Sequence, residues 1–232
     1  GGMVTLTSGI FIGLPNITTI FSNNIAGSGQ YMFQDGTVSL EKSSGTQSVV
    51  TNPANYFNNL TVNTGETVTF TGNTQVRKNL VIQAGVLDPQ GFQIEIRGNW
   101  TNNVGTAGFT EGTGRVIFSG PSANQLCSDE TFNILELNKI SFSLQVDGST
   151  VTCAQYDYAV GSVTVTNNGT FTANDLADNG IYGGFYLNPG CVINLHQDAG
   201  QFIDLGATVN FNGGGTFNVY GGSSVSVWGF NA

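Results

Sequence analysis

The sequence has few charged residues. Its 232 residues include 6 Lys and Arg and 15 Asp and Glu, so 9% of the chain is charged, where roughly 25% is usual for globular domains. With 39% apolar residues and 16 Phe, the chain is neither a charge-rich coiled coil nor a charge-driven disordered segment. The formal net charge of −9 argues against nucleic acid or an anionic membrane as the main partner, because both attract cationic surfaces.

Cations and histidine are scarcest in the second part of the chain. Lys139 is the last cationic residue, and no Lys or Arg occurs from residue 140 to residue 232. A phosphate or carboxylate ligand would find no permanent positive charge in this part. His196 is the single histidine, which leaves few ways to build an acid–base or metal site. We therefore expect no cofactor.

Long apolar runs are also missing. No stretch reaches the roughly 18 consecutive apolar residues that a membrane helix needs, so no membrane insertion is expected. The chain does not begin with a basic segment followed by an apolar one, as a signal peptide would. Gly1-Gly2-Met3 resembles a cloning remnant, and we expect the chain to be a piece of a longer protein.

Alternation is what the sequence has in abundance. Runs such as Thr67–Thr71, Phe92–Arg97 and Ser162–Thr166 place apolar residues at every second position, which is the pattern of half-buried β-strands. Turn signals rich in Gly and Asn separate these runs, and no long helical stripe is present. The sequence predicts an all-β chain.

A repeat relates two parts of the chain. Phe57–Asn63 (FNNLTVN) matches Phe132–Asn138 (FNILELN) at an offset of 75 residues, and Gly36–Leu40 (GTVSL) matches Gly114–Phe118 (GRVIF) at an offset of 78. In the last third, strand starts recur every 7 to 10 residues, so three strands take about 24 residues. This spacing suits one coil of a right-handed parallel β-helix with about three short strands per coil. Eight or nine coils, at about 4.8 Å each, would make a rod on the order of 40 Å long.

The repeat also suggests how the chain is organised. We expect residues 1–35 to be an N-terminal cap or the first coils, residues 36–138 the β-helical repeat region, and residues 139–232 a continuing, cation-free β-helix. The alternative fold is a pair of β-sandwich domains, whose turn signals come every 8–12 residues. Corners of the form Gly-Gly and Asn-Asn-Gly favour the β-helix, because its corners use single left-handed Gly or Asn residues, while sandwich hairpins favour two-residue turns.

The repeat carries a resemblance. Phe57–Asn63, Gly98–Asn103 (GNWTNN) and Arg115–Gly120 (RVIFSG) together resemble the Gly/Asn/Thr-rich β-helical repeats of large secreted surface proteins of Bacteroidetes. Many proteins of that group are adhesin-like and end in a type IX secretion sorting domain, which is not visible in this sequence. The match covers residues 36–138 well and residues 139–232 only in style. It implies a β-helical fold and an extracellular or cell-surface address, and it carries over no active site.

The three cysteines have two interpretations. An odd number leaves at least one thiol outside an intramolecular disulfide. Cys127 and Cys153 are 26 residues apart, about one coil, so they could stack on neighbouring coils. A bridge between them would need a register offset, because in-register Cβ atoms lie about 4.8 Å apart and a relaxed disulfide wants roughly 3.8 Å. Otherwise all three, Cys191 included, are small apolar core residues. A Cys191–His196 nucleophile pair is disfavoured because no third partner is present.

Acidic residues gather at one place only. Asp175 and Asp178 lie in the loop Asn174–Gly180 with two amides and a turn glycine, and such oxygen ligands suit Ca²⁺. The spacing differs from that of a known calcium loop, and an Asx-turn explains the same residues. Elsewhere no pair of carboxylates is close enough in sequence to predict glycoside hydrolysis.

The basic residues raise the question of a polysaccharide lyase, an enzyme class that shares the β-helix. Arg77-Lys78 with Arg97 is the one basic cluster, and lyase chemistry would need such cations to neutralise a uronate. The simpler interpretation is an exposed face or an ion pair with Glu95.

Threonine rows give a further alternative, an ice-binding or filament-forming solenoid. The rows are Thr67/Thr69/Thr71, Thr164/Thr166 and Thr170/Thr172. Thr is also a favoured residue of exposed strands, which needs no ligand.

Aromatic residues near loops and strand ends are the remaining candidates, because an aromatic ring can stack on a sugar ring. The candidate glycan contacts are Trp100, Tyr182, Tyr186, Tyr220 and Trp228. We expect a non-enzymatic extracellular structural or adhesion module of a bacterial surface or secreted protein, with glycans or other surface components as partners. Its apolar last strand, Val225–Phe230, suggests end-to-end self-association. The alternative is a carbohydrate-binding or polysaccharide-cleaving β-helix.

Overall fold

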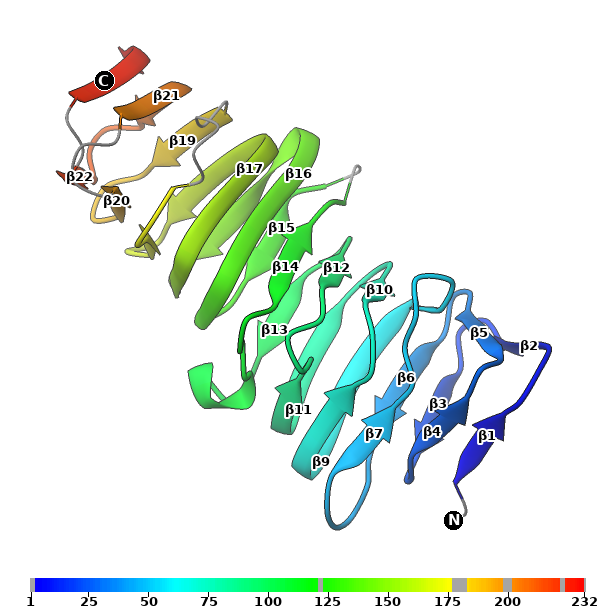
Figure 1. The fold of residues 1–232 in the computed structure, drawn as a ribbon. Coiled ribbons are helices and arrows are strands. Elements are labelled where there is room, and N and C mark those ends of the chain that lie inside the picture. The colour runs from blue at the N-terminus through cyan, green and yellow to red at the C-terminus, as the bar shows by residue number, and fades with distance from the viewer. Residues whose placement is uncertain (1–2, 121–122, 177–182, 198–201, 222–223, 232) are drawn as a thin grey trace. The chain divides into compact units, whose positions relative to one another are not determined.

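The computed structural model describes residues 3–120, 123–176, 183–197, 202–221 and 224–231. The chain divides into two compact units, Gly1–Val116 and Ile117–Ala232. In both units the described residues form β-strands joined by corners, and the one helical element among them is the short 3-10 helix η1 (Thr106–Gly108) (Figure 1). The strands make about nine turns of a parallel β-solenoid. The predicted all-β, β-helical fold is therefore confirmed.

The first unit contains the strands β1 (Val4–Leu6), β2 (Ile10–Gly13), β3 (Thr18–Phe21), β4 (Ile25–Gly27), β5 (Gln30–Phe33), β6 (Thr37–Leu40), β7 (Gln47–Val49), β8 (Tyr56–Phe57), β9 (Asn59–Phe70), β10 (Thr74–Val76), β11 (Leu80–Asp88), β12 (Ile94–Ile96) and β13 (Trp100–Asn102).

These strands stack in three parallel columns. β1, β4, β7 and the second halves of β9 and β11 form one column. β2, β5, β8, β10 and β12 form the next, and β3, β6, the first halves of β9 and β11, and β13 form the third. Each coil therefore supplies one strand to each column, as the three-strand coil predicts. The parallel pairing is incompatible with β-sandwiches, whose sheets are antiparallel.

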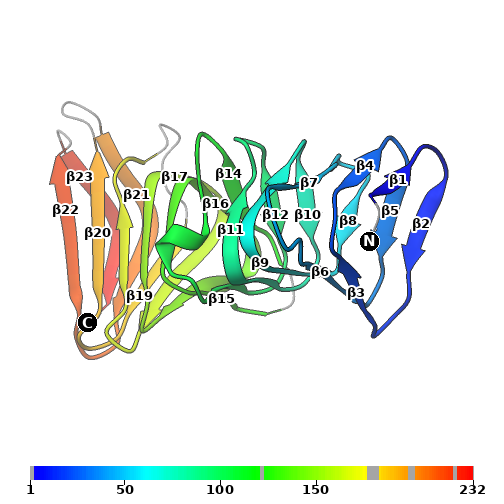
Figure 2. The same ribbon diagram turned by 90° about the horizontal axis from the view of Figure 1, so that it is seen from below.

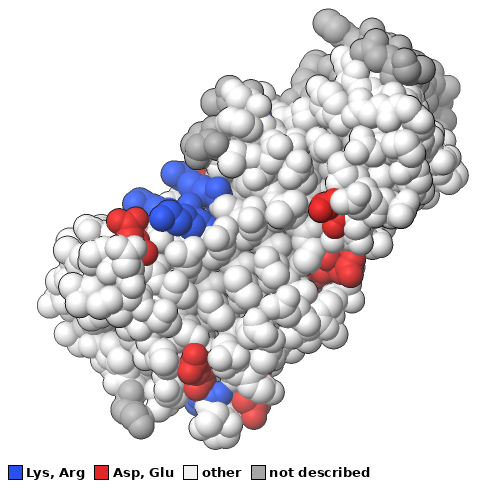
Figure 3. All heavy atoms as spheres, turned by 180° about the vertical axis from the view of Figure 1, so that it is seen from behind, with Lys and Arg blue, Asp and Glu red and all other residues white. Residues whose placement is uncertain are grey.

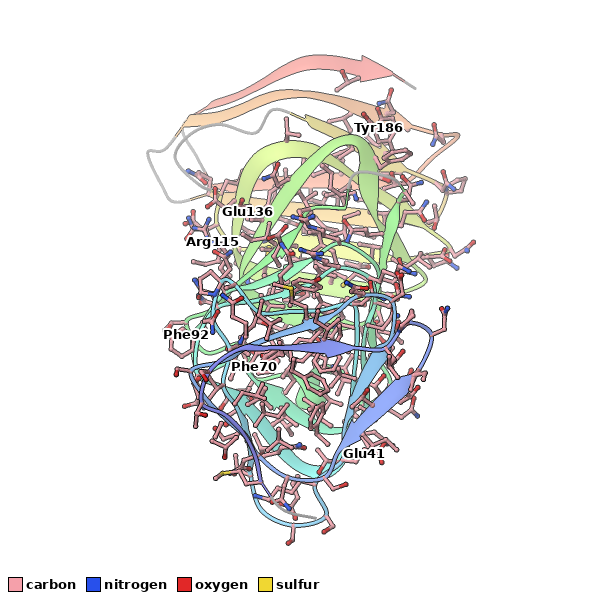
Figure 4. All side chains as sticks on the ribbon, turned by 90° about the vertical axis from the view of Figure 1, so that its right-hand side faces the viewer. Glu41, Phe70, Phe92, Arg115, Glu136 and Tyr186 are labelled. Carbon is pink, nitrogen blue, oxygen red and sulfur yellow. The ribbon has the colours of Figure 1, made fainter. Side chains whose placement is uncertain are left out.

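The core of the first unit follows directly from the alternation. Leu60, Leu80 and Trp100 are in register, 20 residues apart, and all three are fully buried. The rings of Phe33 and Phe57 stack with centroids 5.9 Å apart, and Phe70 in turn stacks on Phe57. Every second side chain thus enters the same interior, where like residues lie on top of one another. Figure 4 shows Phe70 inside the coils and Phe92 on the outside.

Asparagines satisfy the backbone at one corner of this unit. The backbone N–H of Asn79 donates to Oδ1 of Asn59 at 3.2 Å, and the N–H of Asn99 donates to Oδ1 of Asn79 at 2.9 Å. The same residue type at the same place in successive coils gives each corner N–H an acceptor, which an unpaired backbone group requires. A charged residue repeated at this spacing would instead repel its neighbours.

Gly85 marks a corner that tolerates no other residue. Its φ of +82° is left-handed, and a Cβ there would lie 2.3 Å from the carbonyl oxygen of Thr64. We predict that Gly85→Ala lowers the free energy of unfolding by about 1–2 kcal/mol, the cost of a left-handed non-glycine residue. Gly65→Ala is the matched control, because a Cβ at Gly65 meets nothing within 4 Å. Urea denaturation of both variants checks this; equal stabilities would show that the corner is not built as described.

The second unit contains β15 (Gln125–Cys127), β16 (Glu130–Asp147), β17 (Thr150–Thr166), β18 (Thr170–Ala173), β19 (Gly183–Leu187), β20 (Val192–Gln197), β21 (Phe202–Phe211), β22 (Thr216–Gly221) and β23 (Ser224–Asn231), and β14 (Arg115–Phe118) lies across the division between the units.

Here too the strands form parallel columns, and the longest strands turn a corner and belong to two of them. One column consists of the first halves of β16 and β17 followed by β18, β20 and β22. Another consists of β15, the second halves of β16 and β17, β19, and the second halves of β21 and β23 (Figure 2). Ile193 and Phe217 are in register 24 residues apart, which is the coil length expected from the sequence spacing. The coils of the first unit are shorter.

The cysteines are core residues. Cys127, Cys153 and Cys191 are buried free thiols. Cys153 pairs in register with Phe132 and Ala173, while Cys127 pairs with Val146. The 26-residue interval is longer than the local coil, so the two cysteines do not stack on each other and the expected neighbouring positions were wrong. Burial raises the pKa of the Cys127 and Cys153 thiols, which makes both poor nucleophiles.

Candidate functional site: a polar cleft around Tyr186

The second unit has a surface cleft with a volume of about 280 Å³. Its lining residues are polar or aromatic and come from several coils: Asn124, Ser141, Phe142, Ser143, Ser162, Thr164, Tyr186 and Asn212. They lie on or beside the column that contains β15, the second halves of β16 and β17, β19 and β21. The cleft is thus built on the outer face of one sheet.

A register shift forms one wall of the cleft. Asn138 of β16 lies opposite Val160 of β17, but the next paired residues are Ser143 and Ser162. Four residues of β16 therefore lie between two paired positions that β17 connects with one. The extra length, which resembles an enlarged β-bulge, leaves Ser141 and Phe142 exposed beside the sheet, and Phe142 is 37% exposed.

A buried lysine lies at the base of this wall. The side chain of Lys139 is 1% exposed, and its Nζ donates to the carbonyl oxygens of Gly120 at 2.7 Å and Ala123 at 3.1 Å and to Oε1 of Gln125 at 2.6 Å. Burial lowers the pKa of Lys139 to about 8. These bonds fix the backbone on both sides of Asn124. Oδ1 of Asn124 then accepts from the backbone N–H and the hydroxyl of Ser143 at 3.0 and 3.2 Å.

Tyr186 provides the aromatic surface. It is in register with Thr164 on β17 and Asn210 on β21, and it is 36% exposed. A Cβ at Gly184 would lie 2.5 Å from Cε2 of Tyr186, so the tyrosine ring extends over Gly184 in its own strand. The hydroxyl of Ser162 accepts from the backbone N–H of Gly184 at 3.3 Å. Figure 4 shows Tyr186 on the outside of the coils.

The chemistry of the cleft is that of uncharged hydrogen bonding beside aromatic rings. Three serines, one threonine and two asparagines supply hydroxyl and amide groups, each able to donate and accept. Phe142 and Tyr186 supply apolar surface. None of the lining residues is Asp, Glu, Lys, Arg, His or Cys. The arrangement can bind a neutral, hydroxyl-rich ligand, and it places no acid–base pair on it.

The structure separates the aromatic residues that the sequence grouped together. Of the five candidates, only Tyr186 lines the cleft. Trp100 is instead a fully buried core residue, 0% exposed, and cannot contact a glycan. Tyr220 is exposed on β22, in another column, where it stacks on His196 with centroids 4.5 Å apart. Tyr182 and the side chain of Trp228 lie outside the described residues.

No metal or nucleophile site emerges among the described residues. No three His, Cys, Asp or Glu side chains there converge to hold a metal ion. Asp175 accepts the backbone N–H of Tyr156 through its carbonyl oxygen at 2.9 Å, and Asp178 lies outside the described range, so the calcium hypothesis gains no support. Cys191 is buried, while His196 stacks on Tyr220; the two do not form a pair.

One pairing of carboxylates was not foreseen. Glu136 of β16 and Asp157 of β17 are in register on neighbouring coils, although they are far apart in sequence. Residue spacing could have found them only with the coil length known. Neither lines the cleft.

The basic residues of the first unit are engaged with neighbours. The Arg77 guanidinium lies 3.4 Å from the ring centroid of Tyr56, Arg97 Nε is 3.0 Å from Glu95 Oε1, and Lys78 Nζ is 3.6 Å from Asp35. The expected ion pair with Glu95 is therefore present, made by Arg97 within its own strand. Figure 3 shows how few charged side chains interrupt the uncharged surface of the face it displays.

The threonine rows are parts of mixed polar ladders. Thr152, Thr172, Asn194 and Asn218 are in register on successive coils. Asn194 Nδ2 donates to Thr172 Oγ1 at 3.1 Å, and Asn218 Nδ2 donates to Asn194 Oδ1 at 2.9 Å. The side chains thus bond to one another between coils, as cross-strand ladders do. Thr164, from another row, lines the cleft.

Comparison with protein-family models, with curated proteins and with solved structures found no match. Fold and site define the class on their own: a parallel β-solenoid with an uncharged polar cleft on one sheet.

Proposed function

We propose that this chain is a non-enzymatic adhesion module of a bacterial surface or secreted protein, and that it binds neutral carbohydrate in the cleft around Tyr186. The observation that carries the proposal is the composition of the cleft. Two exposed aromatic rings lie among hydroxyl and amide groups, with no ionisable acid or base other than the phenol. Sugar recognition needs apolar ring faces and hydrogen-bonding groups, whereas sugar cleavage needs a pair of carboxylates.

The scaffold supports an extracellular structural role. Amide and hydroxyl ladders such as Thr172–Asn194–Asn218 link successive coils by side-chain hydrogen bonds, and they do so without the repulsion that stacked charges would bring. The repeat around Phe57–Asn63 resembles those of secreted Bacteroidetes surface proteins, which supports a cell-surface address and type IX secretion of the parent protein. None of the helices in the described residues could span a membrane.

The test compares two tyrosines. We predict that wild-type protein binds neutral glycans on an array and in calorimetry, and that Tyr186→Ala weakens this binding by about tenfold, the loss expected for one aromatic contact of roughly 1–1.5 kcal/mol. Tyr220→Ala is the matched control, because Tyr220 is equally exposed but lies outside the cleft, and it should bind as wild type does.

A reducing-end assay on the same glycans separates binding from cleavage. Binding without new reducing ends is expected. Turnover would make the protein a carbohydrate-cleaving enzyme, and binding that responds equally to both tyrosine substitutions would remove the cleft from the proposal.

A further inference from the structure

The cleft has a direction. Its residues occupy successive coils, from Asn124 and Ser143 through Ser162 and Thr164 to Tyr186, and Asn212 follows the next strand of the column, β21. From β16 to β21 there are three steps between coils, which is on the order of 14 Å at about 4.8 Å per step. Along one strand the cleft spans two outward positions, Ser162 and Thr164, which is about 7 Å. The cleft is therefore longer across the strands than along them.

The polar groups repeat in the long direction. Ser143 and Ser162 are in register, as are Thr164 and Tyr186. Asn212, at the far end, donates through Nδ2 to Oδ1 of Asn188 at 3.2 Å, so its own carbonyl oxygen faces no donor from that bond. A ligand that used these groups would need hydroxyls repeated along its length, which a chain of linked sugar rings has.

Charge narrows the ligand further. The cleft has no cation, and residues 140–232 contain six Asp and no Lys or Arg. A uronate or sulfate group would meet only the field of the aspartates, with no partner for its charge. The ligand is therefore an uncharged glycan.

Gly184 determines how the ring is presented. The Tyr186 ring lies where any other side chain at position 184 would begin, 2.5 Å from Cε2 to the Cβ position. The ring consequently extends along its strand beside Ser162, toward the middle of the cleft. A methyl group at position 184 would displace it, and the backbone there is not in the left-handed region that only glycine favours, so the change need not unfold the strand.

We propose that the cleft binds a linear, uncharged polysaccharide lengthwise across the coils, and that Gly184 is a specificity-determining residue because it lets the Tyr186 ring extend over the sheet. This rests on the proposed glycan binding and adds the form of the ligand and its direction.

The experiment is a calorimetric titration with cello-, manno- and xylo-oligosaccharides of increasing length, beside polygalacturonate. We expect affinity to rise roughly tenfold from mono- to trisaccharide and then level off. A monosaccharide that binds as tightly as a trisaccharide overturns lengthwise binding but leaves glycan binding intact. Tighter binding of polygalacturonate overturns the uncharged ligand. Absence of binding by any neutral sugar overturns the proposed function itself.

A double-mutant cycle tests Gly184. Gly184→Ala should weaken trisaccharide binding about tenfold with an unchanged melting temperature, and it should have no further effect in a Tyr186→Ala background, because its action goes through the ring. Additive losses in the double variant would contradict the assigned role.

Discussion

Replacing Trp100 by alanine is expected to lower the free energy of unfolding by about 3–5 kcal/mol, the range for a large aromatic removed from a core. The side chain is 0% exposed. It stacks in register on Leu80 and meets the ring of Phe109 edge-on at 4.9 Å. In a solenoid each core position is covered by the coils on both sides, so the cavity left by the indole has little freedom to collapse.

Phe92→Ala is the control for this change, since Phe92 is 37% exposed and should cost about 1 kcal/mol or less. Urea denaturation followed by circular dichroism measures both. If Trp100→Ala were no more costly than Phe92→Ala, Trp100 would not be the buried residue described, and its interpretation as a surface glycan contact would be restored.

Raising the pH from 8 to 10 is expected to stabilise the wild-type protein by about 2 kcal/mol relative to Lys139→Met. Burial lowers the pKa of Lys139 to about 8 from 10.5. Between these two values the unfolded chain holds a proton on this lysine that the folded protein has lost. Stability therefore rises with pH across this interval, and the lysine adds no pH dependence well below pH 8.

The comparison with Lys139→Met is needed because other buried groups act in the opposite direction. Burial raises the pKa of Tyr31 and of the Cys127 and Cys153 thiols, so these groups lose protons in the unfolded chain first and lower stability at high pH. They are present in both proteins and cancel in the difference. A difference that stays flat from pH 8 to 10 would show that Lys139 is solvated rather than buried.

Local alternation was enough to predict the coils. Leu60, Leu80 and Trp100 fall in register because each belongs to a strand with inward side chains at every second position, and that period is visible in any single strand. Asparagine corners were equally legible, since residues such as Asn59 and Asn79 repeat a conformational need at each turn. The fold thus follows from short-range pattern repeated along the chain.

The site could be predicted only in part, because it depends on how coils of unequal length align. Tyr186 stood out as an aromatic residue beside glycines. Its partners Ser141 and Phe142 are exposed only because β16 and β17 lose register between Asn138 and Ser143, which no local pattern reveals. Trp100 followed the opposite course: it resembled a loop aromatic, yet its register with Leu80 places it in the core.

Lys139 shows the same limit for charge. A lone lysine in a strand is ordinarily an exposed residue, and nothing near it in the sequence is a carboxylate partner. Three neutral oxygens from residues 120, 123 and 125 bind it instead, and that arrangement exists only once the chain before β15 has folded back on β16.

The most direct measurement of the central claim is the location of a bound neutral trisaccharide, by crystallography or by backbone amide shifts in NMR. The account predicts that the sugar lies against Tyr186 and Phe142, with changes at Ser162 and Thr164 on the neighbouring coil and none around Tyr220. A sugar bound on the β20–β22 face, or shifts that leave Tyr186 unaffected, would contradict it.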